Sequence, residues 1–245
     1  MLRALKAAAT VAVLGVLMGG QCTTSSPGTL AFAWRFADNK GVVAGDFTAA
    51  NNGCSTAFVD GITVTLDGTD YSGNFCAVPN NAANGTPGLE ITDVPSGSHT
   101  YTVSAYRGSE LVFHASGQVT MSGVRMPIDV TLSPAGTASS LPIFYTQSGA
   151  YSCTGTPSVT YQILDAYNVP QDNGTLGCTA GQPIVSSHFG TGPYPFGPYW
   201  IHYLSLLDGI GTAVYQTCCR SIDHEGFAQV VDLPLAGGTC QSTCP

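Results

Sequence analysis

Charged side chains are scarce in this chain of 245 residues. Lys, Arg, Asp and Glu make up 9% of the sequence, against about 25% in ordinary globular proteins, while 44% of the residues are hydrophobic. Basic residues are the scarcer kind, since 7 Lys and Arg face 15 Asp and Glu and the net charge is −8. This balance excludes the basic footprint of a nucleic-acid-binding protein and argues against electrostatic docking to anionic lipid.

The usual motifs of enzymes are also absent. The sequence has no Gly-x-Ser-x-Gly elbow, no His-Glu-x-x-His, no Gly-rich phosphate loop and no dinucleotide fingerprint, and its five histidines are scattered. The Asp-Gly and Asn-Gly pairs at 67–68, 173–174 and 208–209 could supply calcium oxygens but are first of all hairpin turns. We therefore predict no catalytic residues, no cofactor and no metal.

Residues 1–21 have the layout of an export signal. Arg3 and Lys6 precede an uncharged stretch at 7–19, and small residues lead to Cys22. The stretch is shorter than the roughly 20 apolar residues that span a bilayer. Removal of this signal would leave 5 basic and 15 acidic residues, a net charge near −10.

The segment Met18-Gly-Gly-Gln-Cys22 resembles the cleavage site of bacterial lipoprotein precursors, a likeness that covers about the first 26 residues. It departs from that pattern in the Gln directly before the cysteine and the Gly three residues before it. Ordinary secretion and an uncleaved signal anchor are the alternatives. The resemblance implies an exported protein held at the bacterial envelope or cell surface by lipid on Cys22, with a flexible polar tether at 22–29.

An internal repeat with a period of about 100 residues organises the rest of the chain. Cys54 corresponds to Cys153 and Cys76 to Cys178. Three further landmarks keep the same order: the strands 61–66 and 158–163, the turns and strands 95–105 and 195–205, and the closing strands 128–132 and 230–235. We therefore predict two modules, 30–132 and 141–245, joined by a Ser, Ala and Gly linker at 133–140.

Each module is predicted to be built of β-strands. Leu30, Phe32, Trp34 and Phe36 alternate with small or polar residues, as do the apolar positions of 61–66, and this period of two buries one face of a sheet. Short strands between Gly and Pro turns predict an all-β protein of two tandem antiparallel β-sandwiches. A single larger barrel or jelly roll is the alternative, against which the repeat and the linker argue.

The segment 89–105 carries a second resemblance. Its apolar strand, Pro-Ser-Gly turn and Tyr-Thr-Val strand resemble the signature of transthyretin-like and carboxypeptidase-regulatory-like domains. The match covers about 40 residues of each module, is weaker in the second, and brings no catalytic residues. It implies Ig-like sandwiches of the kind found on secreted and surface-attached bacterial proteins.

Nine cysteines cannot all pair, but without Cys22 eight remain, as expected of a disulfide framework outside the cytosol. The matched cysteines predict one bridge in each module, each worth about 3 kcal/mol by loop-closure estimates. The adjacent Cys218 and Cys219 would be strained as a mutual bridge, so each is expected to bond into the tail 237–245. A zinc site is the alternative, but the adjacent pair lacks the spacing of zinc ligands. The cysteines expected in disulfides are Cys54, Cys76, Cys153, Cys178, Cys218, Cys219, Cys240 and Cys244.

Aromatic residues gather in the Gly- and Pro-rich segment 189–200, where the first module has none. Rings held on such a loop could stack on a sugar or anchor a partner protein, while the alternative places them in the sandwich core. The candidate ligand-binding residues are Tyr194, Phe196, Tyr199 and Trp200. The sequence thus favours a non-enzymatic surface lipoprotein that is structural or presents a ligand, with a glycan-binding or adhesive module as the second hypothesis. Its expected partners are the membrane, through the lipid, and a glycan or an envelope protein.

Overall fold

The computed structural model describes residues 26–47, 53–73, 75–76, 88–186, 194–241 and 243–245. It is an all-β protein with two separate hydrophobic cores, one formed by residues 30–132 and one by residues 141–233. The only helix in these ranges, α1 (Cys54–Ala57), has four residues. No helix in the described part is long and apolar enough to cross a membrane.

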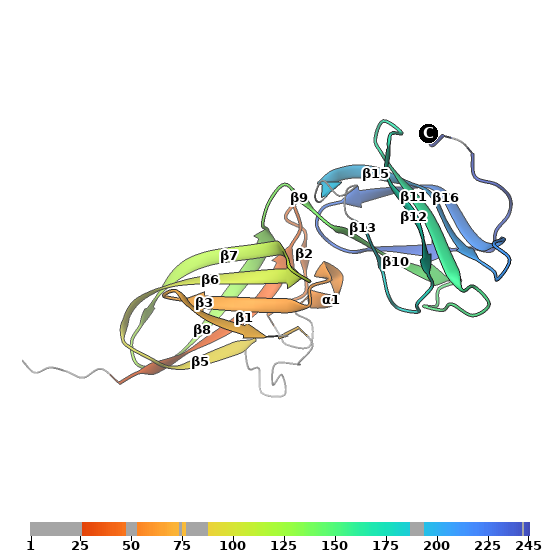
Figure 1. Cartoon of the computed structure of the whole chain (residues 1–245). Coiled ribbons are helices and arrows are strands. Elements are labelled where there is room, and N and C mark those ends of the chain that lie inside the picture. The colour runs from red at the N-terminus through yellow and green to blue at the C-terminus, as the bar shows by residue number, and fades with distance from the viewer. Residues whose placement is uncertain (1–25, 48–52, 74, 77–87, 187–193, 242) are drawn as a thin grey trace, which may run out of the picture.

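The N-terminal unit consists of strands β1 to β8 and α1, arranged in two facing layers (Figure 1). One layer contains β1 (Gly28–Ala37), β2 (Val43–Ala44), β5 (Leu89–Val94) and β8 (Arg125–Pro134). The other contains β3 (Gly61–Leu66), β4 (Thr69–Gly73), β6 (Gly97–Arg107) and β7 (Glu110–Met121). The layers join where the end of β8 pairs with β7.

The alternating apolar residues of β1 fill the core between these layers, as predicted. Phe32 packs edge to face on Tyr101 of β6, with ring centroids 5.4 Å apart, and Phe36 packs on Phe113 of β7 at 5.2 Å. Trp34 is 1% exposed. Burial of each such side chain contributes roughly 1.5–3 kcal/mol to the stability of the fold. The side chains of β1 therefore stabilise the packing of one layer on the other.

The C-terminal unit, strands β9 to β17, repeats this plan. One sheet has the order β13 (Ile184–Ser186), β10 (Leu141–Gln147) and β17 (Gln229–Leu233). The facing sheet has the order β12 (Pro170–Gly177), β11 (Ser158–Asp165), β15 (Gly197–Leu207) and β16 (Ala213–His224). A short ladder joins β9 (Ala138–Ser139) to β14 (Tyr194–Pro195).

Equivalent strands of the two units pair alike. The pairs β3–β4, β3–β6 and β6–β7 correspond to β11–β12, β11–β15 and β15–β16, all antiparallel. One pair in each unit differs from the predicted antiparallel arrangement, because β1 runs parallel to β8 and β10 runs parallel to β17. Parallel strands need a long crossover connection, which the intervening strands supply.

The Asp-Gly and Asn-Gly turns are partly confirmed. Asp67 and Gly68, both with positive φ, form the two-residue turn between β3 and β4. In the turn between β15 and β16, Asp208 accepts hydrogen bonds from the amides of Ile210 and Thr212. The prediction is wrong for 173–174, which lies inside β12, where Gly174 pairs with Tyr161. The chain turns earlier, at Asn168, which has φ 64°.

Four disulfides are present among the described residues. The two predicted from the repeat, Cys54–Cys76 and Cys153–Cys178, are confirmed. Cys218 bonds to Cys240 and Cys219 to Cys244, so the adjacent cysteines both reach the C-terminal tail. Neighbouring residues of a strand normally point to opposite faces. Cys219 departs from strand geometry with φ 47°, which redirects its side chain to the tail.

Peptide mapping without reduction should therefore recover four linked pairs, each confined to one unit. A fragment joining Cys54 or Cys76 to any cysteine beyond residue 140 would contradict this arrangement. Cys22 lies outside the described residues.

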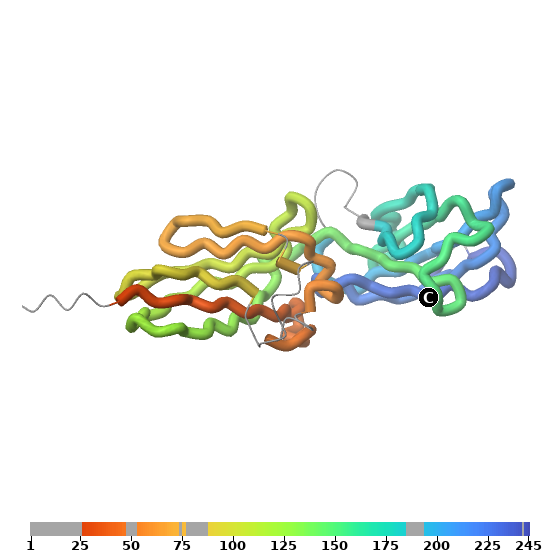
Figure 2. The backbone as a smooth tube through the Cα atoms, turned by 90° about the horizontal axis from the view of Figure 1, so that it is seen from below, coloured from red at the N-terminus to blue at the C-terminus, as the bar shows by residue number. Residues whose placement is uncertain are grey.

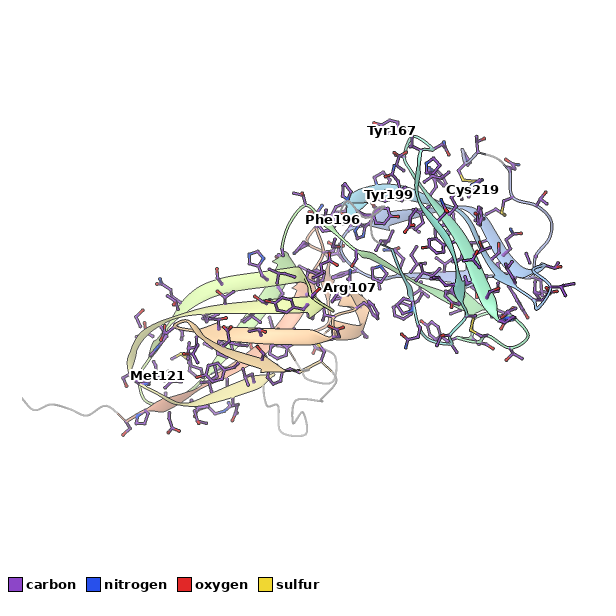
Figure 3. All side chains as sticks on the ribbon, viewed as in Figure 1. Arg107, Met121, Tyr167, Phe196, Tyr199 and Cys219 are labelled. Atoms are coloured by element: carbon purple, nitrogen blue, oxygen red, sulfur yellow. A yellow bond between two sulfur atoms is a disulfide. The ribbon has the colours of Figure 1, made fainter. Side chains whose placement is uncertain are left out.

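The two units follow one another along the molecule (Figure 1), and the view turned by 90° shows the same arrangement (Figure 2). β1 begins at the end of the N-terminal unit that points away from the C-terminal unit. There Gly28 lies against Met121, whose sulfur a Cβ at this glycine would approach to 2.5 Å. In Figure 3, Met121 marks this end and Arg107 the opposite end, where the two units meet.

Candidate functional site at the junction of the two units

The predicted aromatic segment is only partly available to a ligand. Tyr194 is completely buried and Tyr199 is 7% exposed, with their rings packed edge to face at 5.1 Å. The Tyr199 hydroxyl donates to the Pro195 carbonyl oxygen at 2.9 Å. Burial raises the pKa of this Tyr199 hydroxyl. A ligand could not stack on either ring, because both fill the core of the C-terminal unit.

Phe196 and Trp200 are half-buried. Phe196 packs on the ring of His224 with centroids 5.2 Å apart, close to Tyr199 (Figure 3). Trp200 lies in β15, between Leu164 of β11 and Ser221 of β16. The part of the predicted loop at 189–193 lies outside the described residues.

Arg107, the last residue of β6, is the centre of the junction and is 7% exposed. Within the N-terminal unit its guanidinium donates to the carbonyl oxygens of Ala57, at 2.8 Å, and Phe58, at 3.0 Å. Across the junction it donates to the carbonyl oxygen of Ser140 at 2.6 Å and to that of Gly226 at 3.3 Å. The Arg107 side chain thus bonds to three segments: the end of α1, the connection between the units at Ser140, and Gly226, which precedes β17.

The segment predicted as a linker at 133–140 is held in place by this network. Ser140 is 5% exposed, its hydroxyl accepts from Arg107 at 2.7 Å, and its amide donates to the Glu110 carboxylate at 2.9 Å. Burial lowers the pKa of Arg107 to about 10, against the opposing effect of Glu110 and Asp60, so the guanidinium stays charged at neutral pH. The segment predicted as a linker from its Ser, Ala and Gly content is therefore held in a fixed position at Ser140.

A second contact lies on the outside of the junction. Lys40 forms ion pairs with Asp223 and, at 3.1 Å, with Glu225, while the Asn39 side chain donates to Glu225 at 2.9 Å. The hydrogen bonds from Lys40 to Asp223 and Glu225 raise the pKa of Lys40, and the bond to Asp223 lowers the pKa of that carboxyl. Because Lys40 and Asp223 are about half exposed, solvent screens their attraction and the pair adds little stability.

His224 lies behind this contact and is fully buried. Its Nε2 donates to the Ser139 carbonyl oxygen at 2.9 Å, and its ring is surrounded by Tyr194, Phe196 and Tyr199. Burial lowers its pKa to about 4, and the charge of Arg107 acts in the same direction. The imidazole is therefore neutral at physiological pH.

A groove of ≈ 400 Å³ opens beside the junction and is lined by residues of both units. Its walls include Ser55 and Thr56 of α1, Phe144 of β10 and Val230 of β17, together with Tyr151 and Ala228, which lie outside the strands. Phe144 and Val230 are partners in the parallel β10–β17 ladder, and both point away from the core. Their position on the outer face of the sheet makes the groove accessible.

The α1 wall of this groove is fixed from several directions. The Cys54–Cys76 disulfide secures its start, Arg107 holds the carbonyl groups at its end, and the amide of Ala228 donates to the Thr56 carbonyl oxygen at 3.0 Å. Phe58, which ends the helix, has φ 50°, a strained conformation for an aromatic residue. Its ring packs on Phe144 with centroids 5.2 Å apart. Contacts with both units therefore hold Phe58 in this conformation.

The lining of the groove suits binding better than catalysis. It contains two aromatic rings, aliphatic groups and hydroxyls, and none of its residues carries a charge or a nucleophilic thiol. No group of three or more His, Cys, Asp or Glu side chains arranged to hold a metal occurs among the described residues. Sequence reasoning missed this groove because its walls come from separate segments, at 55–56, 144–151, 181 and 228–230. Residues 141–147 carry no signal either, since Phe144 is flanked by buried residues on both sides.

No protein-family model and no curated protein matches the chain. Among solved structures, the chain is similar to a "putative cell adhesion protein" of Bacteroides fragilis, at 8% identity and a TM-score of 0.37, with 90% of this chain and 98% of that one covered. It is also similar to a "putative cell adhesion protein" of Bacteroides ovatus, at 10% identity and a TM-score of 0.35, with 89% and 95% covered.

The Bacillus anthracis TIE protein is similar at 12% identity and a TM-score of 0.26, with 86% of this chain covered. The chain spans only 34% of the length of that protein. At this level of similarity the matches concern the β-fold and carry no conclusion about function.

Proposed function

We propose that this chain is a non-enzymatic surface lipoprotein that presents a binding groove away from the membrane. The observation that carries the proposal is the end-to-end arrangement of the units (Figures 1 and 2). β1 begins at Gly28, so residues 28 and 29 of the predicted tether at 22–29 already belong to the sheet, and this strand begins at the end away from the C-terminal unit. A lipid on Cys22 would therefore place the length of the N-terminal unit between the membrane and the groove at its far end.

Two further features support this role. Four disulfides suit a protein that works outside the reducing cytosol. The junction network built on Arg107 positions the C-terminal unit against the N-terminal one, as a protein that displays a ligand requires. A purely structural envelope component would need the same arrangement but no accessible groove, and the groove therefore favours the ligand-presenting role.

The adhesive or carbohydrate-binding role through residues 194–200 is the weaker alternative. It now rests on Phe196 and Trp200 alone, because Tyr194 and Tyr199 belong to the core.

The tether can be tested directly. Cells expressing the full chain should incorporate labelled fatty acid into it, and the protein should partition into detergent, whereas Cys22→Ser should release it into the soluble fraction without label. Thr23→Ser, one residue further along, is the matched control and should keep both properties. A wild-type protein that is soluble and unlabelled would contradict the proposal.

A further inference from the structure

We infer that the junction groove binds an uncharged carbohydrate, with a sugar ring packed on Tyr151 and Phe144. The inference rests on the proposed function, to which it adds the chemical class of the ligand. It uses a site distinct from the aromatic segment at 194–200, and the argument depends on the charge, rings, hydroxyls and size of the groove.

Charge is the first discriminator. The lining of the groove contains no Asp, Glu, Lys, Arg or His, and the whole chain has a net charge of −8. An anionic ligand would meet no cation in the groove and would be repelled by the chain as a whole. A cationic ligand would find no carboxylate there. The complementary ligand is therefore neutral.

The exposed ring of Tyr151 can receive one face of a sugar, with the edge contact to Phe144, at an interplanar angle of 74°, closing the site beside it. Tyr151 is 51% exposed, although its ring packs edge to face on Phe144, with centroids 6.1 Å apart. Phe144 is held in turn by Phe58. Val230, 58% exposed, extends this apolar floor. A pyranose has one face of C–H groups that can pack on such a floor while its hydroxyls point elsewhere.

Hydrogen-bonding residues line the groove as well. Ser55 and Thr56 of α1 are exposed and belong to its lining, so they bring two hydroxyl groups to it. A hydroxyl both donates and accepts, which matches the hydroxyls of a sugar. A ligand without polar groups would leave these hydroxyls unused, so the combination of an apolar floor with hydroxyl groups favours a carbohydrate over a lipid chain.

The size of the groove agrees with a short segment of glycan. Its volume of ≈ 400 Å³ lies near the lower end of the range of small-molecule sites, about 300–1,000 Å³. Gly181 borders the groove and has no side chain to narrow it. Among the described residues other than Gly181 and its chain neighbours, no atom lies within 4 Å of the position that a Cβ would take there, which leaves room for a chain of sugars to continue beyond the bound ring.

The experiment uses the full-length protein in detergent on an array of neutral and acidic glycans, followed by titration calorimetry with the neutral oligosaccharide retained best. Tyr151→Ala should weaken binding of that oligosaccharide about tenfold, because it removes one packed ring. Ser55→Ala with Thr56→Ala should weaken it several-fold.

Tyr167→Ala is the matched control, because Tyr167 is 87% exposed in the turn between β11 and β12 and does not line the groove. Figure 3 shows it far from Arg107 at the junction. It should bind like the wild type, and thermal melts should show all variants folded. An array without any neutral glycan retained, retention of acidic glycans or proteins only, or equal binding by the Tyr151 and Tyr167 variants would overturn the inference. The lipid-labelling result is independent of these outcomes, so loss of glycan binding alone leaves the proposed surface role standing.

Discussion

Replacement of Arg107 with Ala should lower the free energy of unfolding by about 4 kcal/mol, since loss of one partner from a buried charged network costs roughly 3–5 kcal/mol. The change would leave the carbonyl groups of Ala57, Phe58, Ser140 and Gly226 without their donor inside the junction. Buried polar groups without partners account for most of that cost.

The same change should also loosen the connection between the units, because Arg107 supplies hydrogen bonds to both of them. Urea denaturation would measure the loss of stability, and small-angle scattering would show a broader distribution of distances. Arg107→Lys keeps the charge but not the planar fork, so it should recover only part of the stability.

Arg125→Ala is the matched control. Arg125 bonds to Glu90 on the surface, where the side chains are 48% and 38% exposed, and such pairs contribute less than about 1 kcal/mol. Equal stability of the Arg107 and Arg125 variants would show that the junction network does not hold the units together.

Acid should weaken the protein through His224. Its pKa is about 4 in the folded protein, against an ordinary value of 6.5 for histidine. As the pH falls below 6.5, His224 becomes protonated in the unfolded chain, whereas in the folded protein it stays neutral down to about pH 4. Stability is therefore fully present above pH 6.5 and declines by about 3 kcal/mol down to pH 4.

The pH window separates this effect from those of other groups. The carboxyls of Asp67, Asp223 and Asp232 have lowered pKa values, so their contributions to stability are lost only below 3.8, the ordinary pKa of an aspartate. His99 acts in the opposite sense, because its hydrogen bond with Asp67 raises its pKa. Its contribution is present below pH 6.5 and is lost as the pH rises through the folded pKa.

Urea denaturation at a series of pH values between 7 and 4 provides the measurement. His224→Phe keeps an aromatic ring among Tyr194, Phe196 and Tyr199 but cannot titrate, so it should flatten the decline while costing about 1 kcal/mol at pH 7 for the lost hydrogen bond to Ser139. His114→Gln, at an exposed position, should decline like the wild type. A wild type whose stability is constant from pH 7 to 4.5 would contradict the assignment.

The sequence predicts local structure well, because the alternation in β1 and β3 is itself the physical cause of sheet burial. The repeat likewise identifies the partners in Cys54–Cys76 and Cys153–Cys178. The parallel pairing of β1 with β8 could not be read from the pattern, because alternation does not encode strand direction.

Long-range contacts account for the other differences. Tyr194 and Tyr199 lie in a Gly- and Pro-rich segment typical of an exposed loop, yet the pairing of Tyr194 with Ser139 in the short β9–β14 ladder and the inward phase of β15 bury both rings. Arg107 reads as an ordinary residue before a turn, and its importance depends on Gly226, 119 residues away. The composition of residues 133–140 suggests mobility, because nothing local indicates that Arg107 and Glu110 will hold Ser140.

The parallel pairing of β1 with β8 has a mechanical consequence for a protein anchored at one end and loaded at the other. The anchor would pull on the start of β1 at Gly28, while a load on the C-terminal unit would pull on the end of β8 at Pro134. Because the strands run in the same direction over the register from Thr29 and Arg125 to Phe36 and Leu132, these forces act along the strands in opposite directions. The hydrogen bonds between them are then sheared together rather than opened one after another, so the force-bearing path passes through the most extensively paired parallel strands of the molecule.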